Sequence, residues 1–273
     1  MIRRAEPVVY SSWKKGAPLG QEQTEQFERD GYLVLTDVFS VQELAALQAA
    51  SERVGRQCAK EHADKVVFER DSEKIRTLFG IHAMEGLLKT TANHPRLIHT
   101  MRYLLDDEVY VHQSRLNVKN ACYGSGFEWH SDFETWHAED GMPGMRCISA
   151  TLLLTDEISA GGALKFIPGS HKTFVACPGE TPDQDYQDAL RKQAVGKPPV
   201  LFLNLLQEMG GVQELVAPAG SVVLFDCNLM HGSGTNTCDH LRANLFYVYN
   251  AVSNALGNPY AADAPRPQCI AAR

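Results

Sequence analysis

The sequence predicts a mainly β protein with flanking α-helices, whose core is a β-sandwich or jelly roll. The strongest indication is a change in the residue pattern at Val109, after which short β-type runs alternate with Gly, Pro, Asn and Asp turn signals. Before that point, helical periodicity and capping signals dominate. The length of 273 residues also suits one β-rich domain that buries a single large core.

We therefore expect a single domain over residues 1–273, with no internal repeat and no interdomain linker. Residues 1–108 are expected to form mostly helical support, and residues 109–256 the β core. Segment 177–199 interrupts the strand pattern with a Pro-rich loop and a short helix. Such an insertion is typical of a lid over the mouth of a barrel.

The helical support starts with a short amphipathic helix, GQEQTEQFERDG, which should end at Gly31 and lead into a buried strand, YLVL. Ser40 and Glu43 form a capping box ahead of an Ala/Leu-rich helix that extends to about residue 62. A further helix begins at Pro95, because proline is favoured at the first helical position. Its apolar side is predicted to carry Leu97, Ile98, Met101 and Leu104.

The β core is predicted from six runs in chain order: VYVHQSRLNVK, RCISATLLLT, ALKFI, ELVA, SVVLFD and RANLFYVYNAV. In the first run, strand alternation places Gln113, Arg115, Asn117 and Lys119 on one face. Alternation puts Tyr110, His112, Leu116 and Val118 on the other face. A solvent-facing edge strand would show the same polar set, but the position just before FEWHSD favours a pocket.

Composition and charge exclude several classes of function. The net charge is −7 and no run of Lys or Arg is present, so a nucleic-acid partner is not expected. No stretch of 18 apolar residues and no signal-peptide pattern occurs, which predicts a soluble cytoplasmic protein with no membrane partner. The seven scattered cysteines contain no CxxC pair, so neither a disulfide framework nor a thiolate zinc site is indicated. A homodimer is one possible assembly.

The residues FEWHSD place His130 and Asp132 two positions apart, so in an extended segment both side chains point to the same side. His231 follows a predicted strand 99 positions later and supplies a third ligand. Two histidines and one carboxylate leave coordination positions open, which is the arrangement used by non-haem iron(II) oxygenases. The three residues are therefore predicted to hold iron and to be catalytic.

Arg242 stands eleven residues after His231, at the start of the last predicted strand. A guanidinium there is suited to bind the distal carboxylate of 2-oxoglutarate with two parallel hydrogen bonds. A surface arginine at a strand end is the alternative, and the pairing with the metal ligands favours the binding role. The expected co-substrates are thus 2-oxoglutarate and O2.

The segment FEWHSDFETWHAEDGMP (127–143) resembles the signature of the ectoine hydroxylases, a bacterial branch of the phytanoyl-CoA-dioxygenase-like superfamily of iron(II)/2-oxoglutarate enzymes. The resemblance continues in VHQSRLNVK, IPGSHK, the GETP loop followed by LRKQ, LFDCNLMHGS, NLFYVYN and RPQCIAAR, and so spans nearly the whole chain. It implies a double-stranded β-helix core, of jelly-roll or cupin-like form. It also implies hydroxylation of ectoine to 5-hydroxyectoine, a compatible solute that protects cells under osmotic or heat stress.

The resemblance implies roles for individual residues as well. His130, Asp132 and His231 match the iron ligands, while Lys119 and Arg242 match contacts to 2-oxoglutarate. Asn117, on the same strand face as Lys119, is a further candidate for cosubstrate binding. The residues expected at the substrate are Gln113, as a contact to ectoine, and Trp136, whose indole would stabilise it.

The chain departs from the family pattern at positions near the pocket or its loops: Glu128, Asn120–Cys122, Gly144 and Ser159–Ala163. None of them is a predicted metal ligand. Another small cyclic amino acid such as proline therefore stays open as the substrate. From a different class, a non-catalytic metal-binding or sugar-binding jelly roll also fits the His/Asp set. A zinc hydrolase would need a well-placed general base, and the sequence suggests none.

Overall fold

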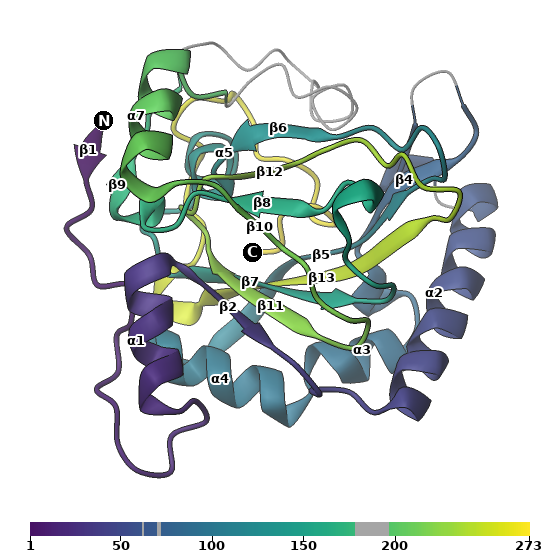
Figure 1. Cartoon of the computed structure of the whole chain (residues 1–273), viewed down its shortest axis with the longest axis horizontal. Helices are drawn as coiled ribbons and strands as arrows, with labels where there is room; N and C mark the ends of the chain where they lie inside the picture. The colour runs from purple at the N-terminus through teal and green to yellow at the C-terminus, as the bar shows by residue number, and fades with distance from the viewer. Residues whose placement is uncertain (62, 70–71, 178–196) are drawn as a thin grey trace.

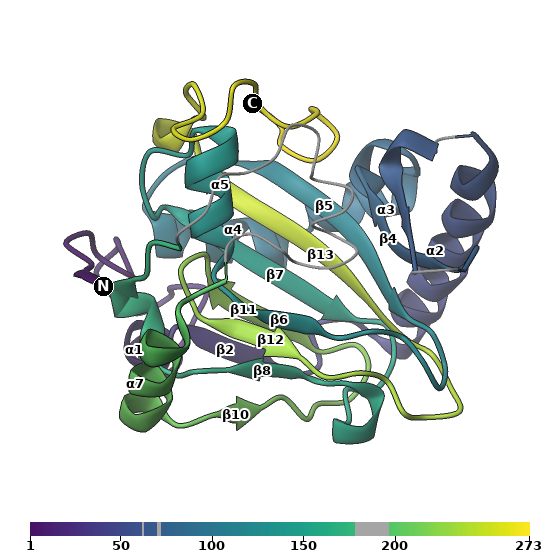
Figure 2. The ribbon, with the colours of Figure 1, turned by 90° about the horizontal axis from the view of Figure 1, so that it is seen from above.

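The computed structural model describes residues 1–61, 63–69, 72–177 and 197–273. Two antiparallel sheets face each other, and together they form the jelly-roll core that the sequence predicted (Figures 1 and 2). The larger sheet has seven strands in the order β2 (Tyr32–Leu35), β11 (Val222–Asp226), β7 (Cys147–Leu153), β13 (Arg242–Ala251), β5 (Val109–Lys119), β4 (Ile75–Phe79) and β3 (Val66–Phe68).

The smaller sheet lies over one face of the larger sheet and carries part of the functional site (Figure 2). Its four strands are β10 (Gln213–Glu214), β8 (Leu164–Phe166), β12 (His231–Ser233) and β6 (Phe127–His130). Phe166 and Phe225 belong to the apolar cluster between the sheets, and their ring centroids are 5.7 Å apart. A separate pair, β1 (Ile2–Arg3) and β9 (Thr173–Phe174), ties the N-terminus to the core.

Helices cover the other face of the larger sheet (Figures 1 and 2). Their buried residues, such as Leu47, Leu88 and Met101, form one cluster with sheet residues such as Leu245. The helices in the described part of the chain are α1 (Gln21–Asp30), α2 (Val41–Glu61), α3 (Gly86–Ala92), α4 (Pro95–Leu105), α5 (Asp132–Asp140) and α7 (Val200–Gly210), with 3-10 turns at Ala63–Lys65, Ile81–Ala83, Ser159–Gly161, Ser170–Lys172 and Val252–Asn254.

The predicted helix signals appear in the structure. Gly31 ends α1 with a φ of 80°, and its N–H donates to the carbonyl of Phe27. A Cβ at Gly31 would lie 2.3 Å from Nδ1 of His171, so both backbone conformation and space require glycine there. Before α2, the Ser40 N–H donates to Glu43 and the Glu43 N–H donates to the Ser40 hydroxyl, which is the predicted capping box.

Other elements differ from the expectation. The segment expected to be mostly helical also supplies β2, β3 and β4 to the larger sheet, and β2 is an outer strand in which only Leu33 is buried. Helices α3 and α7 were not anticipated, because their apolar runs are short or lack a clear polar face. The predicted lid at 177–199 falls almost entirely on residues outside those described.

A β-bulge in β5 corrects one predicted strand face. Gln113 pairs with Val248, but Val111 pairs with Tyr249, so His112 is the extra residue. The bulge reverses the alternation before Gln113 and brings Tyr110 and His112 to the same face as Gln113. The prediction that these two residues lie on the opposite face was wrong, because strand alternation cannot reveal a bulge.

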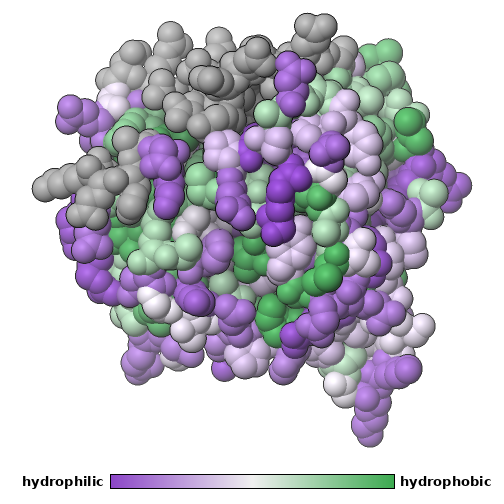
Figure 3. Space-filling view, turned by 180° about the vertical axis from the view of Figure 1, so that it is seen from behind, coloured by the Kyte–Doolittle hydropathy of each residue, from purple (hydrophilic) through white to green (hydrophobic). Residues whose placement is uncertain are grey.

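No described helix is long and apolar enough to cross a bilayer. Seen from behind, hydrophobic side chains form small areas among hydrophilic ones (Figure 3).

Candidate active site

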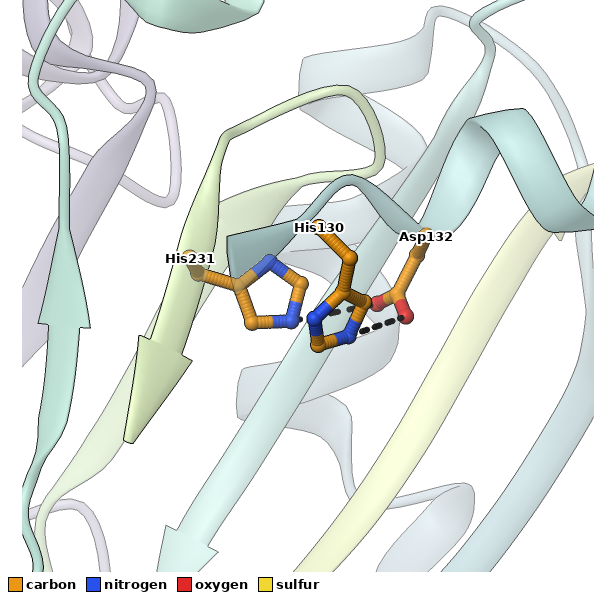
Figure 4. A group of neighbouring side chains, drawn as sticks. All are labelled: His130, Asp132 and His231. Atoms are coloured by element: carbon orange, nitrogen blue, oxygen red, sulfur yellow. Dashed lines mark ion pairs between the residues drawn. The ribbon is translucent and has the colours of Figure 1, made fainter. Parts of the chain in front are cut away.

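The three predicted metal ligands meet in space (Figure 4). His130 ends β6 and His231 begins β12, and the two residues are direct partners across these antiparallel strands. Nε2 of His130 lies 3.8 Å from Oδ1 of Asp132, and Nε2 of His231 lies 3.9 Å from Oδ2 of Asp132. One ligand atom from each residue falls within 4.8 Å of the others. The three donors can therefore surround a single ion.

Asp132 reaches the two histidines by a different route from the one predicted. The extended segment ends at Ser131, and Asp132 is the first residue of helix α5. A strand-to-helix turn, rather than continued strand alternation, thus brings the carboxylate beside His130. The helix N-terminus also favours an ionised carboxylate at this position.

Backbone carbonyls orient both imidazole rings. Nδ1 of His130 lies 2.7 Å from the carbonyl oxygen of Glu128, and Nδ1 of His231 lies 2.9 Å from that of Leu229. A carbonyl only accepts, so Nδ1 carries the proton and Nε2 keeps its lone pair for a metal. This support for both rings is typical of metal-binding histidines.

The protonation states of the three ligands also suit a cation. Burial lowers the pKa of His130 to about 3 and lowers that of His231, so both rings are neutral near pH 7. Burial alone raises the pKa of Asp132, but His231, Arg115 and His130 outweigh it and the pKa is lowered. Oδ2 of Asp132 is buried without a hydrogen-bond partner, which a bound ion would satisfy. The residues fit a divalent metal of the iron(II) type.

Arg242 and Lys119 are neighbours, because they are partners between β13 and β5. The guanidinium of Arg242 is buried and pairs with Glu157, with Nη2 2.5 Å from Oε1 and Nε 2.7 Å from Oε2. Nζ of Lys119 donates to the carbonyl oxygens of Gly162 and Gly234 and to the hydroxyl of Ser233. No motif in the sequence points to Glu157, which lies 85 positions before Arg242.

Burial, together with the positive charge of Arg242, lowers the pKa of Lys119 to about 6. The three oxygens around Nζ match the three donors of an ammonium group. The third cosubstrate candidate, Asn117, accepts a hydrogen bond from the hydroxyl of Thr77. The binding roles of Lys119, Asn117 and Arg242 therefore stay predictions, while the structure defines their surroundings.

The predicted substrate residues lie on the same side of the barrel. Nε2 of Gln113 donates to the carbonyl of Ile270, and its Oε1 accepts from Arg115. Trp136 is buried on α5, and its ring meets that of His112 edge to face at 5.2 Å. Their contacts to a substrate stay predictions too.

Arg115 lies on the same face of β5 as Gln113 and Lys119, and the sequence predicted no role for it. Its guanidinium lies 4.6 Å from the ring centroid of Phe246 and influences the pKa of Asp132. Among the described residues, no carboxylate forms an ion pair with it, and its Nε is buried without a partner. A half-buried cation that lies near the metal ligands is a natural receptor for an anionic group.

The C-terminal segment closes over α5. Arg266 binds Asp140 through two hydrogen bonds, from Nε at 2.8 Å and from Nη2 at 2.5 Å. The Ala272 N–H donates to the carbonyl of His112. The C-terminal segment is thus bonded to α5 and β5.

Residues 27–244 match the family model "Phytanoyl-CoA dioxygenase (PhyH)". The chain belongs to this family. A relative of the PhyH chain is the ectoine dioxygenase of Sphingopyxis alaskensis, which is 47% identical over all of this chain and 89% of the relative.

Two solved structures are also close to the PhyH chain. The crystal structure of EctD from S. alaskensis with 2-oxoglutarate and 5-hydroxyectoine has a TM-score of 0.91 and 44% identity, covering 100% of this chain and 90% of that one. The structure of the same protein with bound iron has a TM-score of 0.88 and 43% identity, and the match covers 99% of this chain and 90% of that one. Both comparisons support the double-stranded β-helix fold of the PhyH chain.

Proposed function

We propose that the protein is an iron(II)- and 2-oxoglutarate-dependent dioxygenase that hydroxylates ectoine to 5-hydroxyectoine. The observation that carries the proposal is the cluster of His130, Asp132 and His231, with both Nε2 atoms directed at one carboxylate. Close relatives that are named ectoine dioxygenase support the choice of substrate. The expected products are 5-hydroxyectoine, succinate and CO2.

His130, Asp132 and His231 would hold iron(II) through three positions and leave others open. The bound metal would supply the activation of O2 that the side chains themselves cannot perform. The residues of the chain orient the reactants instead. Arg242, with Lys119 beside it, would receive the distal carboxylate of 2-oxoglutarate.

Ectoine is a small zwitterion, with a cyclic amidinium and a carboxylate. Arg115 offers an unpaired cation near the metal ligands for the carboxylate. Trp136 offers an indole face for the amidinium, by packing or by a cation–π contact. Gln113 fixes Arg115 through its Oε1 and can present its amide to the same ligand. These contacts would place one C–H bond of the ring beside the metal.

We expect ectoine to be oxidised in preference to proline and phytanoyl-CoA. The protein is reconstituted anaerobically with iron(II) and 2-oxoglutarate, O2 is admitted, and a mass gain of one oxygen is measured for each compound. Gln113→Ala and Trp136→Ala should each reduce ectoine hydroxylation. Equal activity of both variants, or a product only from proline, would reject ectoine as the substrate while leaving the oxygenase chemistry intact.

We also propose a cytoplasmic homodimer that binds neither nucleic acid nor membrane. Helix α7 supports the dimer, because it packs Leu206 inward yet exposes Leu201 at 67% and Met209 at 78%. A helix that is apolar on its outer face is usually covered. A second copy would cover it without adding another component, and closed homodimers are the most common assemblies.

The double variant Leu201→Lys/Met209→Lys should convert the dimer into a folded monomer. Both side chains are exposed in the single chain, so the fold itself should tolerate lysine. Light scattering after size-exclusion chromatography gives the mass of each protein. A parent protein that is already monomeric, or a variant that stays dimeric, would rule out this face.

A further inference from the structure

Glu157 is a buried carboxylate that the proposed chemistry does not use. Its relative exposure is 0%, and both of its oxygens bind the guanidinium of Arg242. Oε1 also accepts from the N–H of Leu164 at 2.8 Å. The pairing uses Nε and Nη2, which form one edge of the planar guanidinium. The remaining donors of Arg242 therefore point in a direction that Glu157 determines.

The position of Glu157 is itself fixed by the backbone. Its N–H donates to the carbonyl of Ala217 at 2.9 Å, and its own carbonyl accepts from the Ala217 N–H at 3.2 Å. The contact to Leu164 joins the side chain to the first residue of β8. Main-chain bonds to Ala217 and a side-chain bond to β8 thus hold the carboxylate in place, so Arg242 has little freedom to follow a ligand.

The charges around Arg242 leave room for one more anion. Arg242 and Lys119 are two neighbouring basic groups on β13 and β5, and the one negative charge of Glu157 pairs with Arg242. Burial lowers the pKa of Lys119 to about 6, so a further carboxylate beside Nζ would favour the ammonium form and balance its positive charge. A dicarboxylate that chelates the metal at one end could bring its other carboxylate to Arg242 only if its length matches the separation between the metal and the guanidinium.

We propose that Glu157 fixes the guanidinium of Arg242 at one depth and so determines the length of 2-oxo acid that the site accepts. The five-carbon 2-oxoglutarate is preferred over its six-carbon homologue, 2-oxoadipate, because Arg242 cannot retreat by one methylene. This inference rests on the proposed function, in which Arg242 receives the distal carboxylate. Glu157 acts through Arg242 and is a positioning residue.

The test compares the dissociation constants of the two acids by anaerobic calorimetry on the iron(II)-loaded protein, where no turnover occurs. Glu157→Gln keeps the shape of the side chain but places a donor against Arg242 or Leu164. We expect 2-oxoglutarate to bind roughly tenfold more weakly, as for one lost charge-assisted hydrogen bond, and 2-oxoadipate to change less than about threefold. Glu157→Asp should draw Arg242 back and shift the preference toward 2-oxoadipate.

Glu69→Gln is the matched control, because Glu69 forms an equally buried ion pair with Arg76. It should lower thermal stability without changing the ratio of the two dissociation constants. If Glu157→Gln also leaves this ratio unchanged, the inference is overturned, because Glu157 then only stabilises the fold. If the variant binds 2-oxoglutarate more tightly, the inference is also overturned, because Glu157 then competes with the ligand for Arg242. If Arg242→Ala leaves 2-oxoglutarate binding unchanged, the proposed cosubstrate site fails instead.

Discussion

Replacing His130, Asp132 or His231 by alanine is expected to remove ectoine hydroxylation while the protein stays folded. Each residue supplies one of three protein donors. Even the loss of a residue that only hydrogen-bonds to a metal ligand typically lowers metal affinity or activity about 10–100-fold. A loss of more than about a hundredfold is therefore expected for a ligand. Mass spectrometry of 5-hydroxyectoine measures activity, and an anaerobic iron titration measures metal binding.

His99→Ala is the control for these variants, because His99 is an exposed histidine on α4. It should retain the activity and the iron affinity of the parent. Circular dichroism should show the same fold for all four proteins. Near-normal turnover in any one ligand variant would remove that residue from the metal site.

Arg242→Ala is expected to raise the KM for 2-oxoglutarate on the order of a hundredfold, since the loss of a buried charge pair costs about 2–5 kcal/mol. Iron affinity should change little, because Arg242 is not a metal ligand. The variant also leaves Glu157 buried and unpaired, which lowers the free energy of unfolding.

The double variant Arg242→Ala/Glu157→Gln separates binding from stability. Removing the orphaned charge should restore part of the thermal stability without restoring the KM for 2-oxoglutarate. A KM that recovers together with stability would show that Arg242 only supports the fold. An unchanged KM with weaker iron binding would place Arg242 at the metal instead.

Local signals in the sequence predicted most of the architecture correctly. The capping box at Ser40 and Glu43, the glycine stop at Gly31 and the period-two strands each depend on residues a few positions apart. The metal cluster could also be predicted, because two of its members are two positions apart in the sequence and the third follows a predicted strand. Its three residues meet as expected.

Features that depend on distant partners could not be predicted. The bulge in β5 is visible only in the register with β13, so it moved His112 to an unexpected face. The partner of Arg242 comes from a loop 85 positions away, and no local pattern identifies Glu157. The role proposed for Arg115 rests on its having no ion pair with a carboxylate among the described residues. Only the folded structure shows this, because it depends on which distant residues pack beside the guanidinium.

Because His130 and His231 are partners across β6 and β12, metal binding depends on the register of these two strands. The two rings project from opposed positions of β6 and β12, and β6 is the outermost strand of its sheet. A slip of one residue would turn one imidazole to the opposite face and dismantle the site at once. Iron retention in any variant thus reports whether β6 and β12 pair in the correct register. A spectroscopic measurement of overall secondary structure would not detect a slip of one residue.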